Sequence, residues 1–257
     1  MPFEKGDFIL VDYTGRVVET GEVFETTIEE VAKKEGIYRE GGIYEPRLIV
    51  IGEGWVLKAL DERLVELELN KPVTIKIPPE KAFGERDPSK VRMYPIRRLT
   101  AKGITPRIGM RVEVNGRLAT IRTIGSGRVQ LDFNPPLAGK TLAYEVIVRK
   151  KIEDKLEKIK ALIHRRLPMV DIESFKINLS DGEVVIELPE EAFYIEGIQV
   201  SKRGIFMDLQ RFFPEVKTVK FLEEYVRPEA AGGQPPREDE KEKDEENKKD
   251  EEKNEEE

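Results

Sequence analysis

Short runs of alternating hydrophobic and polar residues dominate the first 84 positions of the chain. Residues 8–13 (FILVDY) have the composition of a β-strand and lead into Thr14-Gly15, which are typical turn residues. Residues 48–51 form an apolar strand that ends at Gly52, and residues 73–77 alternate as a half-buried strand. This part of the chain is therefore predicted to be rich in β-structure.

Helical spacing interrupts this pattern between residues 55 and 67. Apolar side chains recur there every three or four positions, which places them on one face of a helix: Val56, Leu57, Leu60, Leu64 and Leu67. The preceding segment, residues 24–48, is rich in Gly and is predicted to form a long loop with a short helix at residues 28–34.

Residues 87–131 have the pattern of a separate small β fold. Four strands are predicted, at residues 91–96, 111–115, 119–124 and 128–131. Asn115-Gly116 is a strong signal for a two-residue hairpin. Residues 141–148 alternate again and return to the pattern of the first region, so the segment between is predicted to be an insertion.

A second region of mixed structure follows residue 150. The predicted elements are an amphipathic helix at 151–164, strands at 174–179 and 183–188, a helix at 198–213 and a strand at 216–221. From residue 227 the chain becomes a Glu/Lys tract that cannot bury enough apolar surface to offset its ordering entropy. That acidic tail is expected to be disordered.

Composition limits the classes of protein to consider. Hydrophobic residues make up 39% of the 257 positions and charged residues 37%, and no apolar run is long enough to span a membrane. The chain starts without a signal-peptide pattern and contains no Cys, so we expect a cytoplasmic protein. Residues 237–257 hold thirteen Asp or Glu against six Lys or Arg and so carry the whole net charge of −7. The remainder is neutral, which gives no general electrostatic reason to expect nucleic acid binding.

Residues for acid/base or covalent chemistry are sparse. His164 is the only histidine, which excludes a histidine-based metal cluster and a Ser-His-Asp triad. The glycines match neither dinucleotide-binding nor phosphate-binding loops. We therefore expect no metal and no cofactor.

Five spaced motifs nevertheless form an ordered pattern. They are Val11-Asp12-Tyr13-Thr14-Gly15, then Gly21 to Thr27 (GEVFETT), Ile51-Gly52 with Val56-Leu57 and Leu60, Lys81-Ala82-Phe83-Gly84, and Thr141 to Val146 (TLAYEV). In this order and spacing they resemble FKBP-type peptidyl-prolyl isomerases. The flanks of the insertion, Ala82 to Pro88 and Asp132 to Gly139, are similar to those of SlyD-type and long archaeal members, whose flap carries an extra domain.

The residue pattern and the resemblance together predict an α+β fold class with three folded parts. An FKBP-like antiparallel half-barrel sheet around a short helix would occupy residues 1–86 and 132–150. An insert-in-flap domain with a small β fold would occupy residues 87–131, a C-terminal α+β domain residues 151–226, and the disordered acidic tail residues 227–257.

The resemblance also implies an activity, the acceleration of cis/trans isomerisation at X-Pro bonds. That reaction is slow because of a barrier of ~18–20 kcal/mol, and an apolar pocket can favour its twisted, less polar transition state without any proton transfer. The implied catalytic residues are Tyr13, Phe24, Glu25, Val56, Leu57, Leu60, Phe83 and Tyr144. Among them, Tyr13 would orient Glu25 or a substrate carbonyl.

This chain departs from the family pattern at several of these positions. Leu60 stands where many relatives have Trp at the pocket floor, and Glu25 replaces the commoner Asp. Arg47 occupies a position that is often aromatic, and Pro135 stands where SlyD-type chains usually have His. Trp55 is interpreted as a rim or packing residue.

In relatives the inserted domain holds unfolded chains, so unfolded or partly folded proline-containing polypeptides are the expected partners. Adaptable apolar side chains could supply that surface, or could simply fill the core of the insert: Met93, Tyr94, Ile96, Ile104, Ile108 and Met110.

Three other functions remain open from the sequence. The first is a holdase without catalysis, although the retained aromatic set favours an enzyme. The second is an RNA- or ribosome-associated factor acting through the basic residues near His164-Arg165-Arg166, which the acidic tail argues against. The third is a homodimer through the aromatic C-terminal domain, with Phe193, Tyr194, Ile198, Phe206, Leu209, Phe212 and Phe213.

Overall fold

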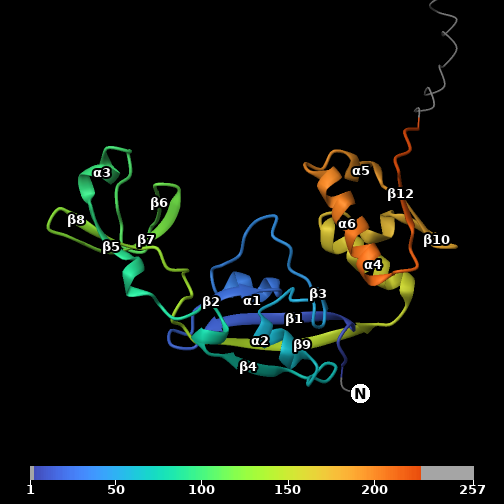
Figure 1. Ribbon diagram of the computed structural model, residues 1–257, viewed down its shortest axis with the longest axis horizontal. Helices are drawn as coiled ribbons and strands as arrows, with labels where there is room; N and C mark the ends of the chain where they lie inside the picture. Colours follow the sequence, from blue (N-terminus) through green and yellow to red (C-terminus); the bar gives the residue numbers. More distant parts are fainter. Residues whose placement is uncertain (1–2, 227–257) are drawn as a thin grey trace, which may run out of the picture.

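An antiparallel sheet of five strands, called the base sheet below, lies at the centre of the computed structural model, which describes residues 3–226 (Figure 1). Its strands are β1 (Phe8–Val17), β2 (Val23–Thr26), β3 (Arg47–Val50), β4 (Val73–Ile77) and β9 (Leu142–Ile152). Their order is β2-β1-β9-β4, and β3 pairs with the first half of β1. Strand β9 follows the insertion in sequence, so the two ends of the insertion return to one sheet.

The turn predicted at Thr14-Gly15 is wrong, because β1 continues through both residues. Gly15 pairs with Glu25 on β2 and with Tyr144 on β9, so it lies in the middle of a three-strand ladder. Backbone hydrogen bonds from both sides outweigh the local turn preference of this dipeptide. In place of a turn, the pairing of β1 with β2 shows a register shift between Gly15 and Arg16.

Two short helices accompany the base sheet, α1 (Glu29–Lys34) and α2 (Lys58–Leu64). Helix α2 is shorter than the predicted span 55–67, but the face that was predicted to be buried does pack, with Leu60 and Leu64 almost fully covered. The buried Asp61 carboxylate accepts the backbone N–H groups of Gly52 at 2.9 Å and Gly54 at 3.1 Å. These bonds hold residues 52–57 as a loop ahead of the helix.

The insertion forms its own four-stranded antiparallel sheet in the order β5-β8-β7-β6. Its strands are β5 (Val91–Pro95), β6 (Arg111–Val114), β7 (Arg117–Gly125) and β8 (Arg128–Asp132). The predicted hairpin at Asn115-Gly116 is confirmed, since both residues have positive φ angles and join β6 to β7. A short helix, α3 (Ile96–Thr100), was not predicted, and its Leu99 is fully buried in the core of the insert.

The C-terminal domain combines helices with a three-stranded mixed sheet. Its elements are α4 (Lys155–Arg166), α5 (Glu190–Phe193), α6 (Ile198–Phe212), β10 (Lys176–Ser180), β11 (Glu183–Glu187) and β12 (Thr218–Leu222). Strands β11 and β12 are parallel because α5 and α6 lie between them in the chain. The prediction that the first helix starts at Lys151 is wrong: β9 runs to Ile152, and the Asp154 side chain caps α4 by accepting the Glu157 N–H at 2.9 Å.

One hydrophobic core joins the C-terminal domain to the base sheet. Phe8, Leu48, Val50 and Ile152 of the sheet pack with Ile159, Leu162, Ile163 and Leu209 of helices α4 and α6. The intervening residues Ile9, Val11, Ile49 and Ile51 belong to the separate core beneath α2. Because side chains alternate along a strand, the two cores occupy opposite faces of the base sheet.

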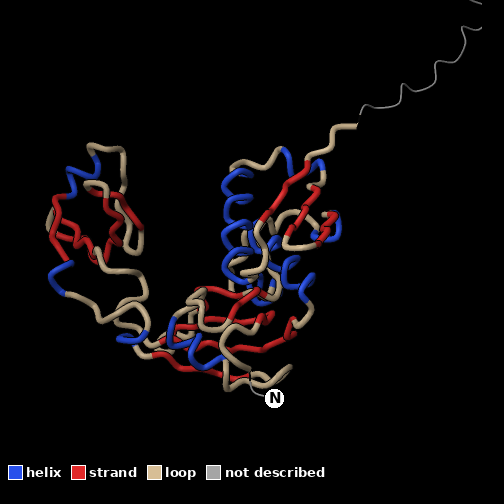
Figure 2. Tube along the Cα trace, turned by 45° about the vertical axis from the view of Figure 1, so that its right-hand side comes forward, coloured by secondary structure: helices blue, strands red, loops and turns tan. Residues whose placement is uncertain are grey.

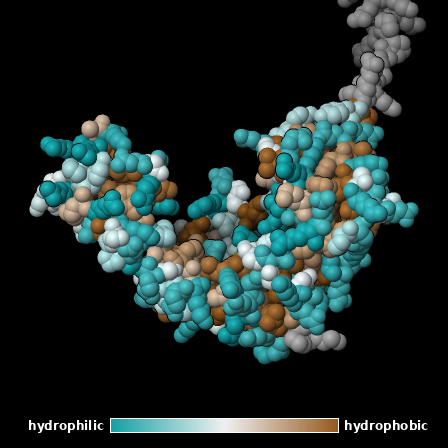
Figure 3. Space-filling model, in the orientation of Figure 1, coloured by the Kyte–Doolittle hydropathy of each residue, from teal (hydrophilic) through white to brown (hydrophobic). Residues whose placement is uncertain are grey.

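The insert and the C-terminal domain rise from opposite ends of the base sheet toward the same side (Figures 1 and 2). Figure 3 shows the hollow between them, with apolar side chains exposed along its floor. The α+β fold class is confirmed. In the part of the chain from residue 3 to 226, no helix combines the length and apolar character needed to cross a bilayer. The predicted disordered tail lies outside the described residues.

Candidate active site

Two tyrosines and a leucine form a buried apolar floor on the α2 side of the base sheet. Tyr13 on β1, Tyr144 on β9 and Leu60 on α2 are at most 3% exposed. The Tyr13 and Tyr144 rings meet edge-on with centroids 6.0 Å apart. Phe24 on β2 adds a second edge-on contact to Tyr144 at 5.7 Å. The floor therefore consists of interlocked rings with fixed orientations.

Partly exposed side chains surround this floor. Val56 and Leu57 lie in the loop just before α2 and, like Phe24, pack against the same core while keeping some accessible surface. Phe83 follows a short 3₁₀ turn (Pro79–Lys81) and is 41% exposed, outside that core. The structure thus brings six of the eight predicted residues into one hydrophobic cluster. Of the other two, Glu25 is connected to the cluster by its hydrogen bond to Tyr144, and Phe83 does not pack against the cluster.

Two hydrogen bonds fix the polar ends of the tyrosines. The Tyr144 hydroxyl donates to Glu25 Oε1 at 2.7 Å, and Arg47 Nη1 donates to the Tyr13 hydroxyl oxygen at 2.6 Å. The expectation that Tyr13 orients Glu25 is therefore wrong, because Glu25 bonds to Tyr144. The Tyr13 hydroxyl keeps its own proton for another acceptor, so its alternative role toward a substrate carbonyl stays a prediction.

Both phenols hold their protons tightly. Burial, followed by the nearby negative charge of Glu25, raises the pKa of Tyr13 to about 12, although the Arg47 guanidinium acts in the opposite direction. Burial, the Glu25 charge and the hydrogen bond to Glu25 raise the pKa of Tyr144 well above its usual range. Near neutral pH both side chains are uncharged hydrogen-bond donors, which suits a site that binds and desolvates a substrate.

Two residues near this site lie outside the predicted catalytic set, Arg47 and Trp55. Arg47 was noted only as a departure from the family pattern, yet it holds Tyr13. Trp55 is confirmed as a packing residue. Its ring packs edge-on against Phe212 of α6 with ring centroids 5.8 Å apart, and the Arg165 guanidinium carbon of α4 lies 3.8 Å from the centre of the Trp55 ring. No local sequence pattern could have paired Trp55 with residues more than one hundred positions away.

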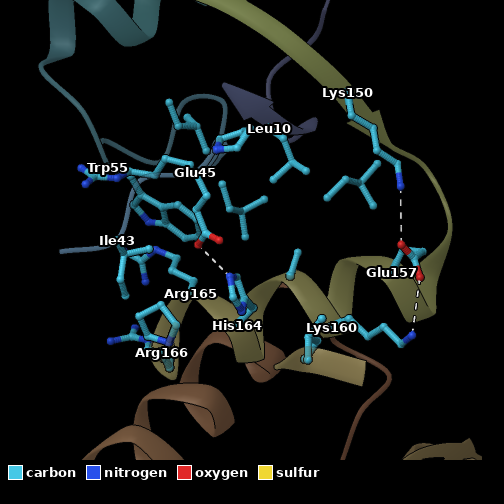
Figure 4. A pocket seen from close by; sticks show the side chains of 18 of the residues that line it. Leu10, Ile43, Glu45, Trp55, Lys150, Glu157, Lys160, His164, Arg165 and Arg166 are labelled. Atoms are coloured by element: carbon cyan, nitrogen blue, oxygen red, sulfur yellow. Dashed lines mark hydrogen bonds and ion pairs between the residues drawn. The ribbon is translucent and has the colours of Figure 1, made fainter. Parts of the chain in front are cut away.

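A cavity of about 690 Å³ lies between β3 and α4, where Leu10, Leu48 and Ile152 of the core shared with the C-terminal domain line it (Figure 4). Its lining includes Arg47, Trp55, His164 and Arg165. None of the eight predicted catalytic residues lines it. Eight Lys, Arg or Glu side chains stand among the apolar residues of its lining, so the cavity is more polar than the aromatic floor.

The six predicted client-binding residues of the insert divide into two groups. Met93, Ile108 and Met110 are 54%, 70% and 39% exposed. Tyr94, Ile96 and Ile104 pack against the small core of the insert, as the alternative interpretation expected. Leu118 and Ile124 on β7 are also exposed, at 56% and 38%, and were not predicted.

A floor of this kind, with two protonated phenols and one hydrogen-bonded carboxylate, suits the binding of an apolar group. Three family models match successive parts of the chain: FKBP-type peptidyl-prolyl cis-trans isomerase over residues 2–100, FKBP26, IF domain, over residues 92–137, and FKBP26_C-terminal over residues 155–226.

Curated relatives agree with these matches. The short-type peptidyl-prolyl cis-trans isomerase of Methanocaldococcus jannaschii is 36% identical over 146 residues, which are 57% of this chain and 92% of the relative. SlyD, the FKBP-type isomerase of Treponema pallidum, is 31% identical over 120 residues, or 45% of this chain and 68% of the relative. The chain belongs to the FKBP-type peptidyl-prolyl cis-trans isomerases.

Proposed function

We propose that this isomerase binds the proline ring of its substrate on the floor of Tyr13, Leu60 and Tyr144. Phe24, Val56, Leu57 and Phe83 would enclose the ring, and Glu25 would be held in place by Tyr144. The observation that carries this proposal is the cluster of buried rings ending in partly exposed apolar side chains.

Desolvation is the proposed source of catalysis. At the twisted transition state the amide loses conjugation and charge separation, so an apolar surface favours that state over the planar ground state. Even a ~10⁵-fold acceleration requires only about 7 kcal/mol. The protonated Tyr13 hydroxyl could donate a hydrogen bond to a substrate carbonyl while its oxygen accepts from Arg47.

The pocket is tested by prolyl isomerisation of a tetrapeptide with Phe83→Ala, Tyr144→Ala and Tyr144→Phe variants. Phe83 is exposed, so its truncation should lower kcat/KM about tenfold or more with little change in thermal stability. Tyr144→Phe keeps the ring but loses the 2.7 Å bond to Glu25, so it should retain more activity than Tyr144→Ala. Full activity in both Phe83→Ala and Tyr144→Ala would place the reaction elsewhere.

We propose that the insert holds unfolded segments through its exposed apolar side chains, Met93, Ile108 and Met110, together with Leu118 and Ile124. Met side chains adapt to varied partners, and the hollow in Figure 3 gives a bound chain access to the base sheet. Replacing Met93 and Ile108 by Ser should reduce suppression of client aggregation. It should also lower catalysis of protein refolding more than catalysis of a tetrapeptide.

The control for this experiment is Leu69→Ser, which removes a side chain of similar exposure, 52%, from the base of the molecule. An equal loss of aggregation suppression in Leu69→Ser and in the insert variant would count against a specific role of the insert.

The homodimer also stays a proposal. Most of the aromatic residues suggested for it are engaged within the chain, since Phe213 is buried and Phe212 packs on Phe8 at 5.2 Å. Tyr194, which was among the suggested residues, is exposed on the C-terminal domain and would form the contact together with the exposed Val200 and Met207. Light scattering at micromolar concentration should give twice the monomer mass, and a Met207→Glu variant should give the monomer.

A further inference from the structure

The cavity between β3 and α4 differs in character from the proline floor, which lies on the α2 side of the base sheet. It is lined by residues of the base-sheet side, among them Glu45, Arg47 and Trp55, and by His164, Arg165 and others from α4 (Figure 4). Its volume of about 690 Å³ is large enough to accept several residues of a polypeptide. The lining carries five Lys or Arg side chains and three Glu side chains, so its charge is positive.

Arg47 connects this cavity to the proline floor. Its guanidinium donates to the Tyr13 hydroxyl at 2.6 Å, and the residue is exposed, so a substrate lying on the floor can reach it. Because Arg47 both touches Tyr13 and lines the cavity, a side chain next to a bound proline would lie close to the end of the cavity where Arg47 stands.

The carboxylates of the lining are already paired within the chain. Glu45 bonds to His164 at 2.7 Å, Glu157 pairs with Lys150 at 3.5 Å, and Glu173 pairs with Lys160 at 2.9 Å. Arg166 is also satisfied, because it makes two bonds to Asp208, at 2.7 and 2.9 Å.

The positive charges of two guanidinium groups in the lining are not fully neutralised by a carboxylate. Arg165 approaches a carboxylate only at 3.7 Å, and that carboxylate, Asp208, is the one already bound by Arg166. Among residues 3–226, Arg47 forms no salt bridge, and its recorded side-chain partner is the neutral Tyr13 hydroxyl. These two cations are therefore the ones with capacity left for an anion.

Arg47 and Arg165 also repel each other electrostatically. Burial, followed by the charge of Arg166 and less strongly that of Arg47, lowers the pKa of the Arg165 guanidinium, although the charge of Asp208 acts in the opposite direction. The Trp55 ring holds that guanidinium 3.8 Å from its centre. Like charges fixed near each other and partly desolvated are unfavourable, and a carboxylate placed between them would relieve that repulsion while forming charge-assisted hydrogen bonds.

We propose that Arg47 and Arg165 form a carboxylate-binding subsite next to the proline floor, so that the enzyme prefers X-Pro bonds with Asp or Glu beside the proline. This inference rests on the proposed position of the proline pocket. It gives the C-terminal domain a direct part in substrate selection, because α4 supplies one of the two cations.

The test compares kcat/KM for tetrapeptides with Glu-Pro, Gln-Pro and Leu-Pro at low ionic strength. Glu and Gln have nearly the same shape, so their ratio isolates the effect of charge. In the wild type, Glu-Pro should exceed Gln-Pro by about threefold or more, which is the size expected for one partly solvated ion pair, and 0.5 M salt should reduce the ratio.

Arg47→Met and Arg165→Met should each bring the Glu/Gln ratio close to one, whereas Arg165→Lys, which keeps the charge, should retain most of it. Arg111→Met removes an exposed Arg from β6 of the insert and should leave the ratio unchanged. Because the readout is a ratio, a general loss of rate on altering the contact of Arg47 with Tyr13 does not affect it.

The outcomes separate this inference from the proposed function. A wild-type ratio of one with Leu-Pro still catalysed would overturn the subsite and leave the isomerase pocket intact. Survival of the ratio in folded Arg165→Met would also overturn the inference, because α4 would then contribute nothing. If Leu-Pro catalysis is unaffected by Phe83→Ala and Tyr144→Ala, the proposed pocket itself is refuted.

Discussion

Gly15 illustrates how a single position shapes the site. A Cβ atom at this residue would lie 2.6 Å from Phe24 Cζ and 3.1 Å from Tyr144 Cε1, both closer than ordinary contact. The glycine therefore leaves the space in which these two aromatic rings meet at the surface of β1. Its φ angle is not among the positive values, so the requirement is for space and not for backbone freedom.

Gly15→Ala should displace the Phe24 ring, whose accessible edge can move outward. We expect kcat/KM on a tetrapeptide to fall about tenfold, with a loss of unfolding free energy of only about 1 kcal/mol. Gly125→Ala on β7 is the matched control, since a Cβ there meets nothing within 4 Å, and its activity should equal that of the wild type. Unchanged activity in Gly15→Ala would show that the position of Phe24 does not matter.

At the scale of elements, one buried carboxylate joins the insert to the base of the molecule. Asp132, at the end of β8, is 1% exposed and binds Arg86 at 2.8 Å and Arg122 at 3.0 Å. It also accepts the backbone N–H of Asn134 at 3.0 Å, while Asn134 exchanges two hydrogen bonds with the backbone of Asp87. The entering and leaving segments of the insert are thereby held together.

Asp132→Asn should lower the unfolding free energy by about 2 kcal/mol, because two arginines lose their anion. Burial raises the pKa of Asp132, but the hydrogen bonds from Asn134 and Arg122 and the charge of Arg86 outweigh this and lower it. The ionised Asp132 carboxylate therefore contributes to the free energy of unfolding above pH ~4, and this contribution is lost as the pH falls below that value. Denaturant titrations of wild type and variant should converge in acid.

The comparison variant for Asp132→Asn is Glu113→Gln, which makes the same chemical change at an exposed position of β6. It should change the unfolding free energy by less than about 0.5 kcal/mol. A wild-type minus Asp132→Asn difference that stays constant from pH 7 to pH 3 would contradict the proposed ionic role.

At the scale of the whole molecule, the C-terminal domain and the base sheet share a core. Phe212 stands at the centre of this contact, edge-on to Phe8 at 5.2 Å and to Trp55 at 5.8 Å. The same contact holds Arg165 over Trp55, and so sets the position of the cation that α4 presents to the cavity. The position of Arg165 in the cavity therefore depends on how the C-terminal domain packs on the base sheet.

Phe212→Ala should lower stability by about 3 kcal/mol and separate the thermal unfolding of the C-terminal domain from that of the base sheet. Calorimetry should then show two transitions where the wild type shows one. Gln210→Ala truncates an exposed side chain on the same helix, outside the proposed dimer contact, and should leave a single transition. A single transition in both variants would mean that Phe212 is not needed for cooperative unfolding.

The sequence by itself determined the features that depend on local patterns and spaced motifs. Alternating residues predicted the strands β4 and β8 to within about one residue, Asn115-Gly116 predicted its hairpin, and the five motifs identified the residues that form the aromatic floor. Each of these depends on interactions with close neighbours in the chain or on a pattern carried by the whole family.

The tertiary structure alone decided where distant segments meet. It carried β1 through Thr14-Gly15, because ladders on both sides outweigh a local turn preference, and it assigned Glu25 to Tyr144. It also placed Arg165 on Trp55 and Arg47 on Tyr13, pairs that no periodicity relates. Side-chain pairing across a core follows from how two domains pack, and that packing is a property of the folded whole.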